Sequence, residues 1–201
     1  MSEGVLWWQP TTLRAALFPR SSILSEVLLL GFGVLLISAS AQLSIALPFT
    51  PVPVTGQTFA VLLVGSAYGM LRGGVTSLLY VLIGVAGAPV YAHSASGWAT
   101  IIGASGGYLV SFPIASALSG FLAEQRWDRR FNSAIGAMLT GNVVIYLIGL
   151  PWLGVVLHTN LEKTLEYGLY PFVPGDTLKL YLAAGALPLA WRGVERLHRR
   201  D

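Results

Sequence analysis

Apolar residues run through this chain in six long stretches, separated by short segments that carry most of its charged side chains. A helix needs roughly 20 mostly apolar residues to cross a hydrocarbon core of ~30 Å. The pattern therefore predicts an all-α integral membrane protein, a bundle of six transmembrane helices. The stretches cover about 23–46, 57–71, 74–92, 100–123, 133–157 and 177–192.

The glycine-rich region 57–92 is compatible with two crossings or with a single re-entrant pair. Arg72 is followed there by Gly73 and Gly74, and such a cluster favours a turn. We therefore predict two separate crossings. Elsewhere no linker is long enough to divide the chain, so we expect one membrane domain over 1–201. It would consist of an N-terminal cytoplasmic or interfacial segment 1–22, the bundle 23–192 and a cytoplasmic tail 193–201.

Composition supports the membrane interpretation. The 201 residues are 54% apolar and only 10% charged, whereas charged residues make up about a quarter of a soluble domain. Too few charges are present to cover a water-facing surface. Because the chain has no cysteine, disulfides, thiolate metal sites and thiol nucleophiles are excluded.

The positive charges lie predominantly on one side of the six-helix arrangement. Of the twelve Lys and Arg residues, only Lys163 and Lys179 fall on the other side. The remaining ten are Arg14, Arg20, Arg72, Arg126, Arg129, Arg130, Arg192, Arg196, Arg199 and Arg200. The positive-inside rule then places both termini in the cytoplasm, in a multi-pass protein of the cell membrane. The basic charge is thereby explained by helix ends, and no nucleic-acid partner is expected.

The first 22 residues contain no apolar run of signal-peptide length, so we expect no cleaved leader. Their aromatic and leucine side chains stand beside Arg14 and Arg20, which is typical of a segment lying flat at the inner interface. A frayed tail is the alternative. The side chains concerned are Trp7, Trp8, Leu13, Leu17 and Phe18.

Glycines recur at four-residue spacing in two of the predicted helices. Gly65, Gly69 and Gly73 form one row, and Gly103 and Gly107 form another. Helices associate in lipid through close backbone contact, so such rows indicate helix–helix seams. They could lie inside the bundle or on a surface for a partner subunit.

An ionisable pair opens the last apolar stretch. Asp176 and Lys179, in the sequence PGDTLKL, are spaced i, i+3 and would touch on one face of a helix. A charged group at membrane depth is a candidate functional residue, because its burial is costly. Alternatively, Asp176 caps the helix N-terminus and Lys179 extends to the interface.

Four further polar residues are candidates for ligand contacts. The uncharged loop 48–59 has three prolines and contains Gln57, whose amide could bind a ligand or a neighbouring helix. His93 lies in the next outer loop, and Tyr108 and Asn142 lie inside the fourth and fifth stretches. Each of these could instead make a hydrogen bond that only supports packing.

Signatures of catalysis are largely missing from the sequence. Neither lysine stands in a P-loop, and the three histidines show no metal-ligand spacing, so we expect no cofactor and no metal. Gly103-Ala104-Ser105-Gly106 resembles the GxSG motif of rhomboid intramembrane proteases. That chemistry requires a histidine near the serine, and the sixth stretch has none. We therefore predict that the protein is not an enzyme.

Several motifs together resemble the BioY family, the biotin-specific substrate-binding (S) components of energy-coupling factor (ECF) transporters. The segment 51–63, PVPVTGQTFAVLL, resembles the family's PVPxTxQTxAVLL signature, and 171–179, PFVPGDTLK, resembles PFxPGDxxK. Between them, Arg72-Gly73-Gly74, the segment 80–92 and Gly106-Gly107-Tyr108 match in order. Ala104 departs from the family pattern, which often has a proline there.

The resemblance implies a six-helix S component with an outward-facing biotin pocket. Asp176 and Lys179 fall on its acidic and basic residues, while Gln57, the loop around His93, and Tyr108 fall on other lining stretches. The implied partners are biotin, the lipid bilayer, a transmembrane coupling protein and two ATPase subunits. The chain could also act alone or as a homo-oligomer, transport a different small vitamin or carboxylate, or be a purely structural subunit.

Overall fold

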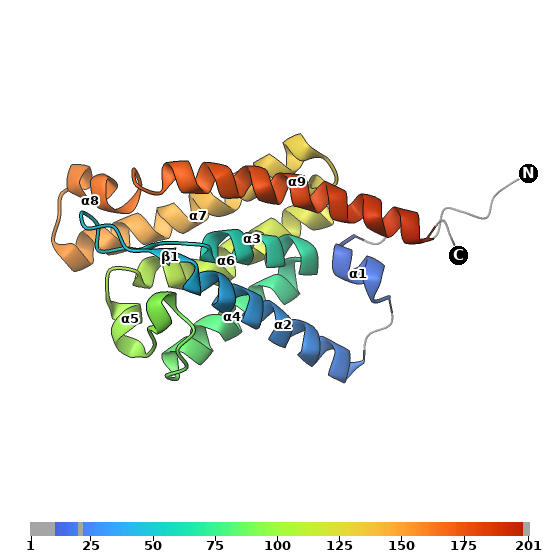
Figure 1. Ribbon diagram of the computed structural model, residues 1–201, viewed down its shortest axis with the longest axis horizontal. Coiled ribbons are helices and arrows are strands. Elements are labelled where there is room, and N and C mark those ends of the chain that lie inside the picture. The colour runs from blue at the N-terminus through green and yellow to red at the C-terminus, as the bar shows by residue number, and fades with distance from the viewer. Residues whose placement is uncertain (1–10, 20–21, 199–201) are drawn as a thin grey trace, which may run out of the picture.

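The computed structural model describes residues 11–19 and 22–198, and within them the chain is predominantly helical (Figure 1). Two-residue strands and short 3₁₀ turns interrupt the helices. In chain order the elements are α1 Leu13–Leu17, α2 Ile23–Gln42, β1 Ser44–Ile45, β2 Val54–Thr55, α3 Gln57–Tyr68, α4 Met70–Val85, η1 Ala92–Ser94, α5 Trp98–Ile102, α6 Gly106–Glu124, η2 Trp127–Arg129, α7 Phe131–Leu157, α8 Leu161–Gly168 and α9 Val173–His198.

Among the described residues, three helices are long and apolar enough to cross a membrane: α2, α6 and α7. The apolar helices α3 and α4 are shorter. The 26-residue α9 is long enough, but it carries charged residues at both ends. The bundle is thus that of a membrane protein, and helix α6 packs against α3, α4 and α7 near its centre.

Several boundaries expected from the sequence are wrong. The first helix ends at Gln42 rather than 46, because the chain then forms the antiparallel β1–β2 pair, in which Ser44 lies opposite Thr55. The stretch 100–123 is two helices, α5 and α6, with residues 103–105 between them. The last helix extends at both ends beyond 177–192, from Val173 to His198.

The turn expected at Arg72 lies instead at Gly69. Gly69 has φ +89°, a conformation that glycine adopts without a steric penalty, and it separates α3 from α4. Gly73 is helical and packs so closely on α3 that an added Cβ would lie 2.6 Å from the Cα of Gly65. Gly69 therefore forms the turn between α3 and α4, and Gly73 allows the two helices to approach closely.

The glycine seams lie inside the bundle. A Cβ at Gly65 would lie 2.2 Å from the backbone oxygen of Ser116 on α6, and one at Gly107 would lie 2.3 Å from the Cβ of Trp152 on α7. Both distances are far below van der Waals contact. Backbone approach at these positions depends on the missing side chain, which confirms the internal-packing interpretation for Gly65, Gly73 and Gly107. Gly69 instead forms the turn, and Gly103 lies between α5 and α6.

We expect Gly65→Ala to destabilise the protein, because the methyl group would push α3 away from α6. Overpacking of this kind costs about 1–3 kcal/mol. The measurement is the melting temperature of the purified variant in detergent. Gly31→Ala in α2 is the matched control, since an added Cβ there meets nothing within 4 Å. If the two variants melted at the same temperature, the close packing of α3 against α6 at Gly65 would be contradicted.

One end of the bundle carries an ionic cluster. Glu26 accepts hydrogen bonds from Arg14 of α1 and from Arg72 of α4, whose Nε lies 2.7 Å from Oε2. The expected interfacial segment therefore contains a short helix, in which Leu13 is buried and Leu17 is exposed. Trp7, Trp8 and Arg20 of this segment lie outside the described residues, as do Arg199 and Arg200 of the C-terminal tail.

A buried carboxylate connects α9 to the segment between α6 and α7. Asp128 is fully buried and accepts a hydrogen bond from the Trp191 indole N–H at 2.5 Å, while the Arg129 guanidinium lies over the Trp191 ring. Burial raises the pKa of Asp128 to about 6 from its ordinary 3.8, although the Trp191 bond and Arg129 oppose the shift.

The raised pKa makes the stability of the protein depend on pH. Between about pH 4 and 6 the folded chain retains a proton on Asp128 that the unfolded chain releases, so stability falls as pH rises through this window. A shift of about two units corresponds to roughly 3 kcal/mol. We expect Asp128→Asn to remove this contribution, as measured by melting temperatures from pH 4 to 7. Glu162→Gln, at an exposed residue, is the control. If the melting temperature of Asp128→Asn changed with pH as it does for Glu162→Gln, the pH dependence could not be assigned to Asp128.

Candidate functional site

The proline-rich loop between α2 and α3 lies over one end of the bundle, opposite the Glu26 cluster. Two hydrogen bonds fix it: Thr50 donates through Oγ1 to the backbone oxygen of Tyr167 in α8 at 2.6 Å, and Gly56 N–H donates to Leu43 at 2.9 Å. Val52 of the loop is itself buried. The loop therefore forms part of a wall and is anchored to α8.

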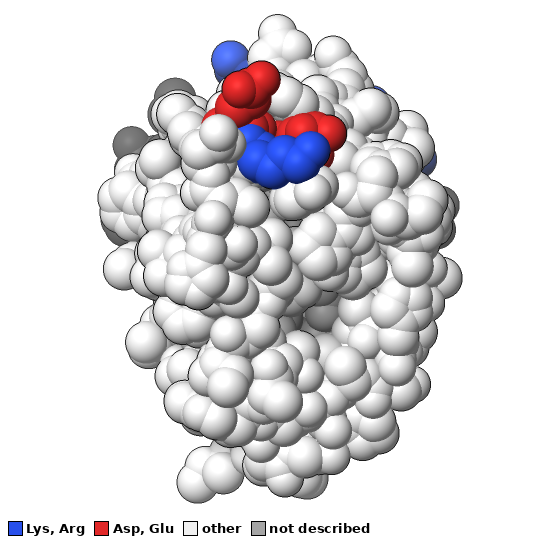
Figure 2. Space-filling view, turned by 90° about the vertical axis from the view of Figure 1, so that its left-hand side faces the viewer, with Lys and Arg blue, Asp and Glu red and all other residues white. Residues whose placement is uncertain are grey.

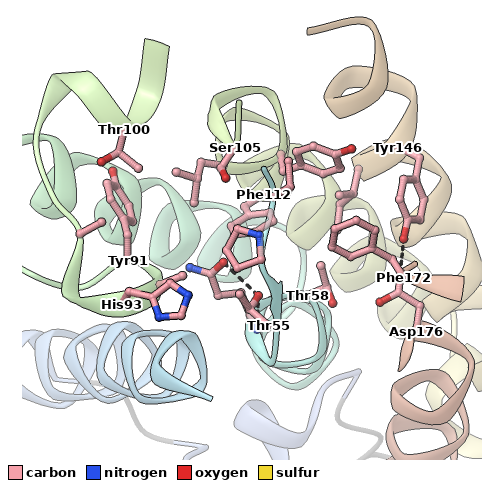
Figure 3. A pocket seen from close by; sticks show the side chains of 18 of the residues that line it. Thr55, Thr58, Tyr91, His93, Thr100, Ser105, Phe112, Tyr146, Phe172 and Asp176 are labelled. Carbon is pink, nitrogen blue, oxygen red and sulfur yellow. Dashed lines mark hydrogen bonds between the residues drawn. The ribbon is translucent and has the colours of Figure 1, made fainter. Parts of the chain in front are cut away.

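Under this loop is a cavity of about 260 Å³, just below the ~300–1,000 Å³ range of ligand pockets. Its walls come from the loop, α3, the segment 91–105, α6, α7 and α9 (Figure 3). The lining residues are Val52, Pro53, Thr55, Gln57, Thr58, Tyr91, Ala92, His93, Ala95, Thr100, Ser105, Tyr108, Leu109, Phe112, Ile145, Tyr146, Phe172, Asp176 and Lys179. The wall is thus mostly apolar, with a small set of polar groups.

The outer face at this end of the molecule is itself hollowed, and its charged side chains gather along one edge (Figure 2). Helix α8 supplies Glu162, Lys163 and Glu166 at this end, and Lys163 Nζ lies 2.8 Å from Glu166 Oε2. The hydrogen bond to Glu166 raises the pKa of Lys163. This exposed ion pair contrasts with the pair inside the cavity.

Asp176 and Lys179 form the charged end of the cavity. Lys179 Nζ lies 3.0 Å from Asp176 Oδ1 and 3.2 Å from Thr58 Oγ1, and the Tyr146 hydroxyl donates to Asp176 Oδ2. Only 7% of Asp176 is exposed. The contact predicted from i, i+3 spacing is confirmed. Because α9 begins at Val173, Asp176 lies within its first turn rather than at the cap, and its charge is also favoured by the helix dipole.

An aromatic wall adjoins this charged end. Tyr108 stacks on Phe172 with ring centroids 6.4 Å apart, and the Tyr146 ring meets Tyr108 edge-on at 6.3 Å. The Tyr108 hydroxyl donates to the backbone oxygen of Gly168 at 2.9 Å, so its ring faces the cavity in a fixed orientation. Such walls favour a compact, largely apolar ligand.

Gln57 and His93 also line the cavity, and His93 lies on the side away from Asp176 (Figure 3). Gln57 is buried; its amide nitrogen donates to the Tyr80 hydroxyl and its oxygen accepts from Thr55 at 3.2 Å. It therefore bonds a neighbouring helix, as one of the two sequence interpretations expected, and it also lines the cavity, so a contact with a ligand stays a prediction. His93 is exposed, and its Nδ1 lies 3.3 Å from Ser44 Oγ.

Asn142 does not line this cavity. It lies one turn from Tyr146 on α7 and lines a separate cavity of about 10 Å³, together with Thr58 and Lys179. The structure thus brings Asp176, Lys179, Tyr108, Gln57 and His93 around one space and leaves Asn142 behind it.

At the charged end of the cavity, the sequence interpretation missed two polar residues, Tyr146 and Thr58. Tyr146 on α7 bonds Asp176 on α9, and Thr58 on α3 bonds Lys179 on α9. The one available signal was that Tyr146 follows Asn142 by four residues and so shares its helix face.

The GxSG motif is explained by packing. Ser105 and His93 both line the cavity, but no hydrogen bond joins them in the described part of the chain, and His93 faces Ser44 instead. Gly106 packs directly on the backbone oxygen of Ile101, where a Cβ would lie 1.6 Å away. No group of three or more His, Cys, Asp or Glu residues suited to a metal ion occurs within residues 11–19 and 22–198.

Comparison with known proteins gives the family. The family model described as "BioY family" matches residues 12–196, nearly the whole chain. The chain belongs to the BioY family. The match includes the proline-rich loop and the Asp176–Lys179 pair, so the site described above lies within the shared region.

Curated BioY relatives support this assignment. A "Probable biotin transporter BioY" of Pyrococcus horikoshii is 38% identical over 83% of this chain and 94% of its own length. A "Biotin transporter BioY" of Thermotoga maritima is 36% identical over 76% of this chain and 89% of its own. These relatives are named as transporters and not as enzymes, so the protease alternative is abandoned.

A solved structure shows the same fold. It is described as the S-component for biotin from an ECF-type ABC transporter, with a TM-score of 0.73 over 86% of this BioY chain and 95% of the other. At 23% identity the likeness establishes the helical architecture.

Proposed function

We propose that this protein captures biotin from outside the cell and is the substrate-binding component of an ECF-type biotin transporter. The observation that carries the proposal is the Asp176–Lys179 pair, which lies with Tyr146 at one end of a small, aromatic-walled cavity in a BioY chain. The ligand, biotin, is taken from the names of the relatives and of the structural neighbour.

The chemistry of biotin fits the charged end of the cavity. Its ureido group offers two N–H donors and one carbonyl acceptor. Asp176 carries carboxylate acceptors and Lys179 an ammonium donor, 3.0 Å apart. A ureido group placed there would donate to Asp176 and accept from Lys179. The valeryl carboxylate of biotin would instead be repelled by Asp176, so we place the ring at this end and the tail at the other.

The opposite end of the cavity suits the carboxylate tail. His93, Thr100 and Ser105 line it, and they offer an imidazole and two hydroxyl groups as donors. No Asp or Glu besides Asp176 lines the cavity in the described residues. The tail would therefore approach neutral or cationic groups only.

The same proposal includes an orientation in the membrane. We infer six crossings, formed by α2, α3, α4, α6, α7 and α9, with both termini in the cytoplasm. The arginine positions support this arrangement: Arg14 and Arg72 meet at Glu26, at the end of the bundle opposite the cavity. The positive-inside rule places that end inside and the cavity outside, in the cell membrane.

Transport against a gradient requires an energy source that this chain does not contain. Neither of its lysines stands in a nucleotide-binding loop. We therefore propose that a transmembrane coupling protein and two ATPase subunits act on the loaded bundle. A homo-oligomer or a chain working alone is the alternative for this step.

Equilibrium binding and thermal stabilisation test the proposal. The purified protein is titrated with labelled biotin, and melting curves are recorded with biotin, desthiobiotin, thiamine, riboflavin and buffer. We expect saturable binding of biotin and stabilisation by the two ligands that carry the ureido ring, since a ligand that binds only the folded state raises the melting temperature. Stabilisation by thiamine or riboflavin alone would indicate a different vitamin, and stabilisation by none would indicate a structural subunit.

A further inference from the structure

Lys179 separates two cavities. With Thr58 it lines the ligand cavity on one side and the cavity of about 10 Å³ on the other. The remaining residues of the small cavity are Phe59, Leu62, Met138, Asn142, Leu180 and Ala183. Of these six, only Asn142 has a polar side chain. The polar group behind the lysine is therefore an amide.

The Asn142 amide is buried and incompletely bonded. Only 8% of the residue is exposed, and its Oδ1 has no hydrogen-bond partner within the described residues. A buried carbonyl oxygen without a partner is rare and costly. Asn142 and Tyr146 are one turn apart on α7, just as Asp176 and Lys179 are one turn apart on α9. Because Tyr146 bonds Asp176, this register places Asn142 beside Lys179.

Lys179 has one donor left to direct toward this amide. An ammonium carries three N–H donors, and those accounted for go to Asp176 Oδ1 and Thr58 Oγ1. A cavity of about 10 Å³ is at the lower limit for one water molecule, which binds where polar partners surround it. The Lys179 ammonium donor and the Asn142 carbonyl acceptor thus face the same cavity, which is about the size of one water molecule.

We propose that Asn142 is a positioning residue for Lys179. One water in the small cavity would accept from the ammonium and donate to the Asn142 side-chain carbonyl, and this bridge fixes the ammonium hydrogen that points away from the ligand. The other two hydrogens are then directed to Asp176 and to the ligand cavity beside Thr58. This inference rests on the proposed function, in which the ureido carbonyl of biotin replaces Thr58 Oγ1 as the acceptor of the second of these hydrogens.

The experiment is a double-mutant cycle on biotin affinity. Asn142→Leu removes the amide while retaining its size, and we expect it to weaken binding about tenfold, as for loss of a hydrogen bond to a charged group. In a Lys179→Met background the same change should alter affinity less than about twofold, because the group it positions is gone. Asn142→Ala repeats the cycle if the leucine variant does not fold.

Ser119→Ala is the matched control, since Ser119 is fully buried, its hydroxyl also has no partner in the described chain, and it lines neither cavity. It should leave affinity unchanged in both backgrounds. An equal loss from Asn142→Leu in both backgrounds, or no loss in either, would overturn the inference. A native protein that does not bind biotin would instead refute the proposed function.

Discussion

Asp176→Asn is expected to weaken biotin binding by at least about two orders of magnitude, or ~3 kcal/mol. The substitution leaves an amide of the same shape but removes the negative charge that accepts the ureido N–H groups. It also leaves the Lys179 ammonium, 3.0 Å away, without its charged partner in a largely buried site. Titration of labelled biotin into the purified variant measures the change.

Glu166→Gln provides the matched control for this substitution. Glu166 also pairs with a lysine three residues away, Lys163, but that pair is exposed on α8, with 55% and 45% of the two side chains accessible. Exposed ion pairs contribute little to the free energy of folding. Affinity should therefore be unchanged, and similar dissociation constants for Asp176→Asn and Glu166→Gln would refute the site.

Lys179→Met is the second large effect. Methionine retains an unbranched apolar stem but cannot donate to the ureido carbonyl, and it leaves the Asp176 carboxylate with Tyr146 as its remaining side-chain partner. We expect biotin affinity to fall by about tenfold to a hundredfold, which is the range for the loss of one charge-assisted hydrogen bond. Lys163→Met on α8 is the control, and the two variants are compared by the same titration.

The expected pattern across these variants is specific to the cavity pair. Both cavity variants should lose most of the stabilisation by biotin, measured for each variant against its own melting temperature without ligand. If Lys179→Met bound biotin as tightly as Lys163→Met, the ligand would have to lie elsewhere in the bundle.

Those parts of the site that depend on one helix could be predicted from the sequence. The contact between Asp176 and Lys179 follows from i, i+3 spacing, whichever neighbours surround them. The long apolar runs likewise predicted α2, α6 and α7, since a crossing depends on length and hydropathy within one segment.

Parts that depend on how helices meet could not be predicted in this way. Tyr146 bonds Asp176 only because α7 and α9 pack in one particular register, and nothing in the pattern of either helix specifies it. The same holds for Thr58 and Lys179, and for Asn142, which lies in the predicted helix but behind the cavity rather than in its wall.

Glycine positions illustrate the same limit. Gly69, Gly73 and Gly74 are each compatible with a turn by local propensity, and contacts decide among them. Gly73 lies against Gly65, where any side chain would collide, whereas Gly69 has the positive φ that ends a helix. The interruption at 103–105 has a similar origin, because the Trp152 indole on α7 donates to the Gly103 carbonyl at 3.0 Å.

An experimental structure of the protein with biotin bound tests the central claim most directly. The account predicts one biotin in the cavity beneath the proline-rich loop, with its ureido ring against Asp176 and Lys179 and its carboxylate toward His93. Biotin bound in the reverse direction, with its carboxylate on Lys179, would contradict the assigned chemistry. Biotin found outside this cavity, for example in the apolar groove between α1 and α2 lined by Leu17 and Phe32, would contradict the site itself.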